Sequence, residues 1–250
     1  IGATDDRARA VMSELYAPLF INQAPLMFTD RRAAELIKYA SNAFLATKIT
    51  FINEIADLCE EVGVNVQDVA RGIGLDNRIG TKFLHAGPGY GGSCFPKDTN
   101  ALAKTAQDYG VPLRLVESVI AVNDQRKRGV ARKVTAACGG SVRGKTIAIL
   151  GLTFKPNTDD MRDSPSIAVI RYLQDNGARI KAYDPKGVEQ AKAELNSVEY
   201  MTAPYACIDG ADALCLVTEW EQFRALDLDR IKSLLKAPVI VDLRNIYKPE

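Results

Sequence analysis

A single cysteine stands in an unusually glycine-rich segment. Residues 87–98 read GPGYGGSCFPKD, with four glycines and two prolines around Cys94. Because Pro96 and a helix-forming stretch follow, we expect Cys94 at or just before a helix N-terminus, where the helix dipole and free amides stabilise a thiolate. Asp98, one turn further on, could orient a water toward a group bound to the sulfur. The segment predicts covalent catalysis by the thiol; the alternative is a glycine-rich turn around a buried, inert cysteine.

A lysine and an amide form a second candidate group. Lys38 and Asn42 lie four residues apart in a stretch whose apolar residues recur at helical spacing, so both side chains would project from one face. Asp30 can cap this long helix and Gly63 can end it. Together the two side chains could donate hydrogen bonds to an alkoxide or a tetrahedral oxyanion. The alternative is a lysine that merely extends from the edge of the helix into solvent.

Helices dominate the first part of the chain, and strands alternate with helices in the second. We expect helices over residues 5–16, 30–63, 100–109 and 112–138. Gly139 and Gly140 mark a boundary. Strands are predicted at residues 146–151, 179–184, 212–218 and 238–244, separated by helices at 164–177, 187–195 and within 220–235. Such alternation predicts an α/β chain, in which a helical central domain is followed by a Rossmann-like, doubly wound parallel sheet.

The first strand of that sheet ends in a polar loop. Residues 151–166, GLTFKPNTDDMRDSPS, lack a GxGxxG fingerprint but contain Lys155, Arg162 and a capped helix start at Ser164. Cationic side chains beside a helix N-terminus suit a phosphate or diphosphate. The alternative is a surface loop whose charges only solvate it.

Composition excludes several classes of protein. The 250 residues carry a net charge of +1, so no nucleic-acid partner is expected, and QRKRG at 125–129 is interpreted as a solvated helix surface. No apolar run is long enough for a membrane span, and a cytoplasmic location is the default expectation. The five cysteines contain no CxxC pair, and His85 is the only histidine. Neither a disulfide framework nor a metal site is expected.

Five motifs occur in order from about residue 30 to the end. They are the Lys38–Asn42 helix, Arg78 in DNRIG, the cysteine segment, LGLTFKPNTDDMRDSP, and the late TEW with DLRN. In this combination the chain resembles the UDP-glucose/GDP-mannose dehydrogenase family, and GYGGSCFPKD is more similar to the UDP-glucose branch than to the GDP-mannose or UDP-N-acetylmannosamine branches. The resemblance implies that residues 1–29 are the tail of an NAD-binding domain, 30–140 a central dimerisation domain, and 141–250 a UDP-sugar-binding domain.

The resemblance also implies a reaction. Two NAD molecules would in turn take hydrides from C6 of UDP-glucose, giving UDP-glucuronate without release of the aldehyde. Cys94 matches the nucleophile that captures the aldehyde as a thiohemiacetal and then carries a thioester. Asp98 and Lys38 match the residues that activate the hydrolytic water, and Lys38 and Asn42 match those that steady the oxyanions.

The remaining matched residues are expected to bind substrate or cofactor. Arg78 matches an arginine that reaches the sugar of a neighbouring subunit, which implies at least a homodimer. The other positions matched to the UDP-sugar site are Tyr90, Gly91, Gly92, Phe154, Lys155 and Arg244, of which Tyr90 and Phe154 are interpreted mainly as packing residues. Lys97 and Arg162 match residues near the NAD. For Arg78 and Lys97 the alternative is an ordinary surface charge.

The chain departs from the family in one respect. The family places its NAD-binding domain before the long helix, whereas no GxGxxG precedes that helix here. We therefore expect the parent protein to be a dehydrogenase and this chain alone to be an inactive fragment. Three alternatives stay open: a GDP-mannose or UDP-amino-sugar dehydrogenase, a non-catalytic module that binds nucleotide sugars and dimerises, and a cysteine hydrolase whose base would have to be His85.

Overall fold

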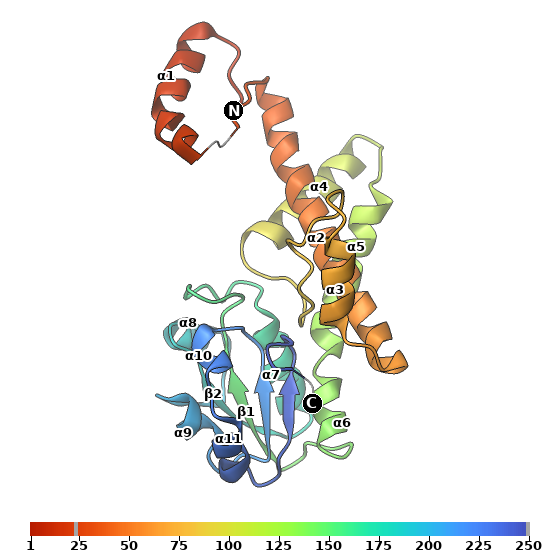
Figure 1. Ribbon diagram of the computed structural model, residues 1–250, viewed down its shortest axis with the longest axis vertical. Helices are drawn as coiled ribbons and strands as arrows, with labels where there is room; N and C mark the ends of the chain where they lie inside the picture. Colours follow the sequence, from red (N-terminus) through yellow and green to blue (C-terminus); the bar gives the residue numbers. More distant parts are fainter. Residues whose placement is uncertain (23–24, 249–250) are drawn as a thin grey trace.

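The computed structural model describes residues 1–22 and 25–248. A long helix connects a small N-terminal segment to a layered α/β body (Figure 1). We call helices α2 to α6 the helical unit, and strands β1 to β5 with helices α7 to α11 the sheet unit. No helix of the described residues is long and apolar enough to cross a membrane.

The N-terminal segment lies apart from the sheet unit (Figure 1). It contains α1 (Asp6–Tyr16) and the 3-10 helix η1 (Ala17–Asn22). The side chain of Asp5 caps α1 by accepting the Ala8 N–H at 2.8 Å. A backbone bridge joins Gly2 to Thr29 and brings the chain back to the start of the long helix.

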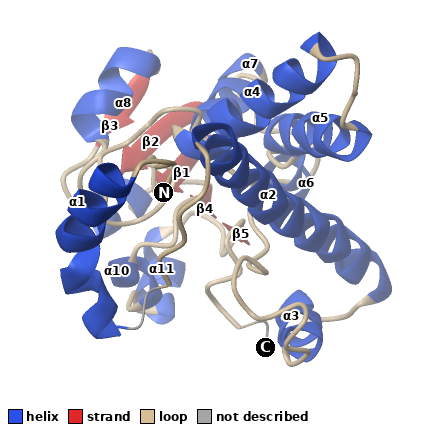
Figure 2. Ribbon diagram, turned by 90° about the horizontal axis from the view of Figure 1, so that it is seen from above, coloured by secondary structure: helices blue, strands red, loops and turns tan. Residues whose placement is uncertain are grey.

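The long helix begins and ends where its capping residues predict. Helix α2 (Arg31–Val62) starts after Asp30, whose carboxylate accepts the Ala33 N–H at 2.9 Å, and stops at Gly63 in the left-handed conformation, φ 69°. It packs against α4 and α5, which lie alongside it when the molecule is seen from above (Figure 2). Its bounds confirm the predicted helix over residues 30–63.

The buried face of α2 is made mostly of small and polar residues, together with the large apolar side chain of Ile52. Its buried side chains include Asn42, Ala43, Ala46, Asn53 and Ala56. The large apolar residues whose spacing predicted the helix are mostly exposed; they are Leu36, Phe44, Phe51, Leu58 and Val62. Small residues let the neighbouring helices approach closely, and the apolar stripe of α2 is left exposed by the residues that the structure describes.

The other helices of the helical unit differ from the prediction in two places. They are α3 (Val66–Gly74), α4 (Cys94–Asp108), α5 (Arg114–Gly129) and α6 (Arg132–Ala137). Helix α4 begins at Cys94, six residues before the predicted start at Asn100. The single helix predicted over 112–138 is wrong: it is divided into α5 and α6, because Gly129 is a poor helix former and the chain turns after it.

The interpretation of residues 125–129 as a solvated surface is wrong for Arg126 and Lys127, although Gln125 and Arg128 are exposed. The Arg126 side chain is 11% exposed and the Lys127 side chain 9% exposed. Both lie on the face of α5 that meets the cysteine segment, where they are paired with carboxylates. The charge pattern alone could not distinguish a solvated run from one that is buried against a loop.

The sheet unit is a parallel sheet with the strand order β3-β2-β1-β4-β5. Its strands are β1 (Thr146–Leu150), β2 (Arg179–Tyr183), β3 (Val198–Tyr200), β4 (Ala213–Leu216) and β5 (Ile240–Asp242). Strands β1 and β4 are fully buried, as expected for central strands covered on both faces. The helices of this unit are α7 (Pro165–Asp175), α8 (Val188–Glu194), α9 (Pro204–Ile208), α10 (Glu221–Arg224) and α11 (Leu228–Leu234).

This architecture confirms the predicted fold class. The sequence did not predict β3, an edge strand of three residues, or the short helix α9, and it predicted one helix where α10 and α11 occur. The domain boundaries at 29/30 and 140/141 stay predictions.

The carboxyl ends of the strands face the helical unit (Figure 1). The strand order reverses between β1 and its neighbour β4, and in open α/β sheets ligands bind beside such a point. The loop that follows β1 therefore lies against the segment that carries Cys94.

Candidate active site

The cysteine predicted to be a nucleophile is exposed at the start of a helix. Cys94 is the first residue of α4, with Ser93 as its N-cap position, and its sulfur lies 3.7 Å from the Ser93 hydroxyl oxygen. The unpaired amides of the first turn favour negative charge near the sulfur. All five cysteines are free; Cys59, Cys207 and Cys215 are buried. Burial raises the pKa of the Cys207 thiol to about 12, so that thiol stays protonated and inert.

The predicted lysine, amide and carboxylate meet beside the first turns of α4. The amide nitrogen of Asn42 donates to Asp98 Oδ2 at 2.6 Å, across two helices. Lys38 Nζ donates to Asn42 Oδ1 at 3.3 Å. Lys97 Nζ donates to the other oxygen of Asp98 at 2.6 Å. The structure thus brings together three residues that were predicted from separate motifs, together with Lys97, which was predicted near the NAD.

Asp98 is ionised although it is nearly inaccessible, with 2% of its surface exposed. Burial by itself would raise the pKa of its carboxyl group. The hydrogen bonds from Lys97 and Asn42 and the positive charges of Lys97 and Lys38 outweigh burial and hold the pKa below its usual range. The hydrogen bond to Asp98 in turn raises the pKa of Lys97. The group therefore presents a fixed carboxylate flanked by two ammonium groups.

Side chains of α2 and α5 hold the backbone of the cysteine segment. Asn53 Oδ1 accepts the Gly87 N–H at 2.7 Å. Asn123 accepts the Tyr90 N–H at 2.8 Å and donates to the Tyr90 carbonyl oxygen at 3.1 Å. Arg126 donates to the Gly87 carbonyl oxygen at 2.6 Å. None of these three residues was predicted from the sequence: Arg126 belongs to the run at 125–129 that was interpreted as a solvated surface, and Asn53 and Asn123 belong to no motif. The spacing of Asn123 and Arg126 on α5 was the available signal.

Tyr90 serves the packing of this segment. Its ring is buried and meets Phe95 edge to face, with the ring centroids 6.0 Å apart. Burial, the largest cause, raises the pKa of its phenol to about 12. Tyr90 therefore stays neutral, which is consistent with a packing residue.

Two glycines allow the sheet unit to touch the cysteine segment. The Gly92 N–H donates to the Arg162 carbonyl oxygen at 2.8 Å. A Cβ at Gly91 would lie 2.2 Å from the Asp163 carbonyl oxygen, and one at Gly92 2.6 Å from the Phe154 ring. Any side chain at these positions would push the two units apart. The glycines thus admit a second backbone; their role in sugar binding stays a prediction.

The polar loop after β1 supplies exposed cations near this contact. Lys155 is exposed, with its ammonium 5.3 Å from the centroid of the Phe154 ring. Arg162 pairs with Asp160 at 2.8 Å and its side chain is 71% exposed. The hydrogen bond to Asp160 raises the pKa of Arg162. Both charges are available to an anion at the ligand-binding edge of the sheet.

Arg244 lies after β5 and reaches the cysteine segment, since a Cβ at Gly87 would lie 3.0 Å from Arg244 Nη1. It donates to the carbonyl oxygens of Val217 at 2.7 Å and Phe154 at 3.1 Å, and pairs with Glu219 at 3.0 Å. Burial lowers the pKa of its guanidinium, and the neighbouring carboxylates act in the opposite direction. Arg244 also lines a cavity of about 880 Å³, which Arg71, His85 and Lys248 line too.

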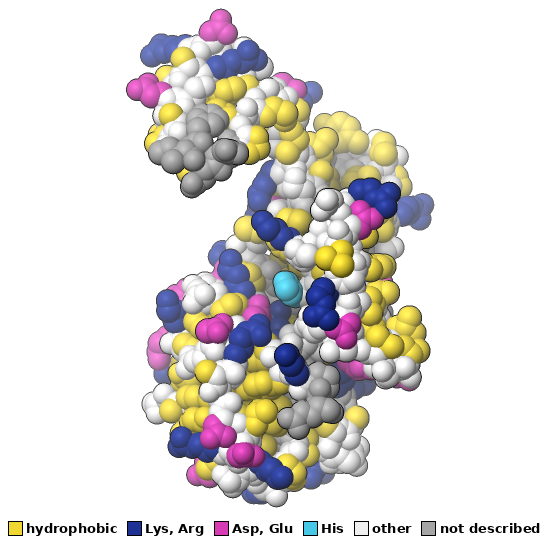
Figure 3. All heavy atoms as spheres, viewed as in Figure 1, with side chains coloured by type: hydrophobic (Ala, Val, Ile, Leu, Met, Phe, Trp, Pro, Cys, Tyr) yellow, Lys and Arg dark blue, Asp and Glu magenta, His cyan; other side chains and the backbone are white. Residues whose placement is uncertain are grey.

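That cavity adjoins the cysteine segment, but Cys94 itself does not line it. Lys and Arg side chains gather where the helical unit meets the sheet unit (Figure 3). Cys94 and Asp98 are outside the cavity, and His85 is inside it. This placement does not favour a cysteine hydrolase in which His85 activates Cys94.

Arg78 stands apart from the other candidate residues. Its side chain is 89% exposed and pairs with Asp76 at 2.6 Å in the loop that follows α3. The hydrogen bond to Asp76 raises the pKa of Arg78. An exposed arginine outside its own site is available to a second subunit, and this role stays a prediction.

Comparisons with known proteins cover both units. The central-domain model of the UDP-glucose/GDP-mannose dehydrogenase family matches residues 32–125, and the UDP-binding-domain model of that family matches residues 148–249. The UDP-glucose 6-dehydrogenase of Rhizobium meliloti (strain 1021) is 66% identical over 250 residues, which are 100% of this chain and 57% of that protein. TuaD, a UDP-glucose 6-dehydrogenase of Bacillus subtilis (strain 168), is 49% identical, over 100% of this chain and 54% of that protein.

A solved structure agrees with these matches. A UDP-glucose dehydrogenase from the hyperthermophilic archaeon Pyrobaculum islandicum superposes with a TM-score of 0.89 and 39% identity, over 99% of this chain and 55% of that one. The chain thus spans about half the length of the curated relatives that it matches.

Proposed function

Because the chain belongs to the UDP-glucose/GDP-mannose dehydrogenase family, we propose that the complete protein oxidises C6 of UDP-glucose to give UDP-glucuronate, with NAD as the acceptor. One observation carries the proposal: an exposed thiol at a helix N-terminus adjoins a Lys38–Asn42–Asp98 group, where the ligand edge of the sheet meets the helical unit. Each of these parts has a role in oxidising an alcohol to an acid through a thioester.

Cys94 holds the carbon that reacts. Its thiol adds to the aldehyde carbon, and the thiol proton passes to the carbonyl oxygen, which gives a thiohemiacetal. Loss of a hydride from that carbon and of the hydroxyl proton leaves a thioester. Attack by water then breaks the carbon–sulfur bond, releases the carboxylate and regenerates the thiol. A thiol suits both stages because the hemiacetal still carries a hydride and the acyl product can be hydrolysed.

Lys38, Asn42 and Asp98 form hydrogen bonds with the oxygen atoms that react, namely the oxyanion at C6 and the attacking water. The ammonium of Lys38 and the amide of Asn42 donate hydrogen bonds to the oxyanion that forms at C6. Asp98, whose pKa is held low, stays ionised and accepts a hydrogen bond from the attacking water. Since Asn42 and Lys97 fix both carboxylate oxygens, the direction of that hydrogen bond is set before the substrate arrives.

Cationic side chains fit the two anionic ligands. Lys155 and Arg244 are proposed to hold the UDP moiety, with Phe154 and Tyr90 as packing neighbours and Gly91 and Gly92 lining the sugar site. The side chains of Lys97 and Arg162 are largely exposed beside the thiol, which fits the diphosphate of a dinucleotide. When bound, NAD supplies the hydride acceptor for both oxidations.

A homodimer is proposed as the active unit. The exposed apolar stripe of α2 is a surface that a second copy would bury, and Arg78 is exposed on the same unit. We further propose residues 30–140 and 141–250 as the central and UDP-sugar-binding domains, and 1–29 as part of an NAD-binding domain, so that this chain by itself is inactive. The two family-model matches support the first two of these domains.

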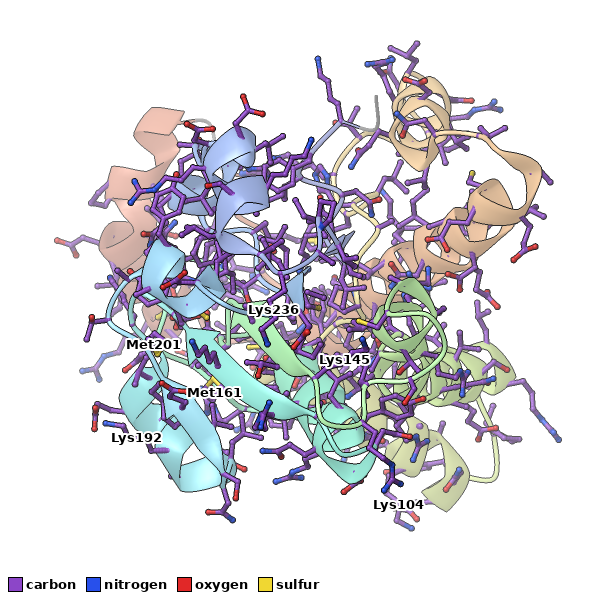
Figure 4. All side chains as sticks on the ribbon, turned by 90° about the horizontal axis from the view of Figure 1, so that it is seen from below. Lys104, Lys145, Met161, Lys192, Met201 and Lys236 are labelled. Carbon is purple, nitrogen blue, oxygen red and sulfur yellow. The ribbon has the colours of Figure 1, made fainter. Side chains whose placement is uncertain are left out.

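Calorimetric titration of this chain with UDP-glucose tests the substrate class. We expect binding that is lost in Lys155→Ala, and weaker binding of GDP-mannose or a UDP-amino sugar. Lys236→Ala is the matched control. Lys236 pairs with Asp212 at the amino ends of the strands (Figure 4), away from the proposed ligand site, so this substitution should not affect binding. Selective binding of another nucleotide sugar would show that UDP-glucose is the wrong substrate assignment.

Turnover of the complete protein tests the reaction. We expect two NADH per UDP-glucose in the wild type and none in Cys94→Ala. Activity of the 250-residue chain alone would contradict its proposed inactivity.

A further inference from the structure

A buried lysine joins the helix behind the cysteine segment to the loop of the sheet unit. Lys127 on α5 has a side chain that is 9% exposed, and its ammonium lies 2.8 Å from Asp163 Oδ1. Asp124, on the same helix, contributes a second carboxylate at 3.4 Å. A buried ammonium is costly unless it is paired, so Lys127 favours the arrangement in which Asp163, whose side chain is 43% exposed, is close.

The stem of the same lysine supports the cysteine segment. A Cβ at Gly89 would lie 2.9 Å from Lys127 Cγ and 3.0 Å from Asn123 Oδ1. Asn123, one turn before Lys127, holds both backbone groups of Tyr90. One face of α5 therefore contacts residues 89 and 90 directly.

Asp163 contacts the segment from the other side. Its backbone has φ 52°, an uncommon conformation for a residue other than glycine. In this conformation its carbonyl oxygen lies against Gly91, and the preceding carbonyl, that of Arg162, accepts the Gly92 N–H at 2.8 Å. The Lys127–Asp163 pair thus holds the loop of the sheet unit against the two residues that precede Ser93 and Cys94.

We propose that Lys127 and Asp163 are positioning residues, which form a latch between the units and fix the distance between the thiol and the loop that carries Phe154, Lys155 and Arg162. The catalytic consequence rests on the proposed function. If that loop holds the nucleotide sugar while α4 presents the thiol, the latch decides whether C6 lies within reach of the sulfur. A small error in that distance costs rate steeply.

Asp163→Asn removes the charge of the latch with little change in shape. Asparagine adopts positive φ as readily as aspartate does, so the backbone conformation is retained. Asp124→Asn is the matched control, because it removes the other carboxylate from the same ammonium, but that carboxylate lies on α5 itself and connects nothing to the sheet unit. Lys127→Met is a second variant that keeps the buried stem.

Hydrogen exchange of this chain tests the latch. We expect the Gly92 amide to exchange about tenfold faster in Asp163→Asn and in Lys127→Met, because loss of the pair frees the Arg162 carbonyl from its partner. In Asp124→Asn the Gly92 amide should exchange at the wild-type rate. Unchanged exchange in Asp163→Asn, or an equal rise in Asp124→Asn, would overturn the latch.

The catalytic role is tested in the complete protein. With UDP-glucose and NAD, Asp163→Asn should lower kcat about tenfold or more and should release aldehyde that semicarbazide traps, whereas the wild type and Asp124→Asn should not. A variant with faster exchange but wild-type kcat and no trapped aldehyde would overturn the positioning role. If the wild-type protein itself made no NADH from UDP-glucose, the proposed function would fail, while the exchange result on the latch would stand.

Discussion

At the scale of single residues, Asp98 shows how neighbours decide the state of a buried group. Its burial favours the neutral acid, yet two hydrogen bonds and two positive charges keep it ionised. Its neighbours are Lys38 and Asn42 on α2 and Lys97 on α4. The carboxylate of Asp98 is therefore held by side chains of two helices. This arrangement makes a definite prediction for pH dependence.

Asp98→Asn should destabilise the chain at neutral pH but not in acid. The pKa of Asp98 is lower in the folded state than the usual value of about 3.9, so ionised Asp98 stabilises the fold above that pH, and the stabilisation is lost as pH falls through the folded-state pKa. Removing the charged acceptor should cost about 1–3 kcal/mol at pH 7. Urea unfolding from pH 7 down to the acid limit would measure the difference between the variant and the wild type.

A surface carboxylate on the same helix is the control for this experiment. Asp108 pairs with Lys104 at 2.6 Å and its side chain is 56% exposed, so Asp108→Asn should cost less than about 1 kcal/mol at any pH. A difference for Asp98→Asn that does not shrink in acid would show that the ionised carboxylate is not what stabilises this position.

The sequence was informative about residues with special chemistry and uninformative about those that position them. Cys94, Asp98, Lys38 and Asn42 belong to recognisable motifs, and three of them meet as predicted, with Cys94 one turn before Asp98. Lys127 was misinterpreted because a run of basic residues has the same composition whether it is solvated or buried. That Lys127 is buried and paired becomes visible only when Asp163, 36 residues away in the sequence, is in place.

At the scale of elements, helix bounds were predictable where capping residues fix them. Asp30 and Gly63 delimit α2, and Ser164 with Pro165 begins α7, as predicted. The division between α5 and α6 was missed although Gly129 was a local signal for it. The three-residue strand β3 was missed because its pairing with β2, rather than a local signal, defines it. The contact between the units depends on Gly91 and Gly92, whose role becomes visible only when the opposing loop is in place.

Gly92→Ala should destabilise the chain much more than Gly110→Ala does. Both glycines have positive φ, 81° and 71°, so the backbone strain of an alanine is comparable. A Cβ at Gly92 would also lie 2.6 Å from the Phe154 ring, whereas nothing lies within 4 Å of one at Gly110. We expect an extra cost of about 1–3 kcal/mol at Gly92, measured by urea unfolding. Equal costs would mean that the Phe154 loop yields freely and does not bear on the cysteine segment.

At the scale of the whole molecule, the exposed stripe of α2 favours association. The exposed fractions of Phe44 and Phe51 are 67% and 49%, on a helix whose opposite face is already packed. Phe44→Glu should therefore convert a dimer to a monomer, as measured by light scattering after gel filtration. Leu228→Glu, at a similarly exposed apolar residue of the sheet unit, should leave the dimer intact. A wild-type chain that is monomeric at micromolar concentration would contradict the proposed interface.

The covalent role of Cys94 is the central claim, and the mass of the protein during turnover tests it most directly. In the complete protein, Asp98→Asn should slow hydrolysis by about 10²-fold or more, so that an acyl adduct accumulates after UDP-glucose and NAD are added. Intact-mass and peptide analysis should place a UDP-glucuronyl group on Cys94, with none on Cys59 or Cys138. Two NADH per UDP-glucose without any adduct on Cys94, in both the wild type and this variant, would contradict the account.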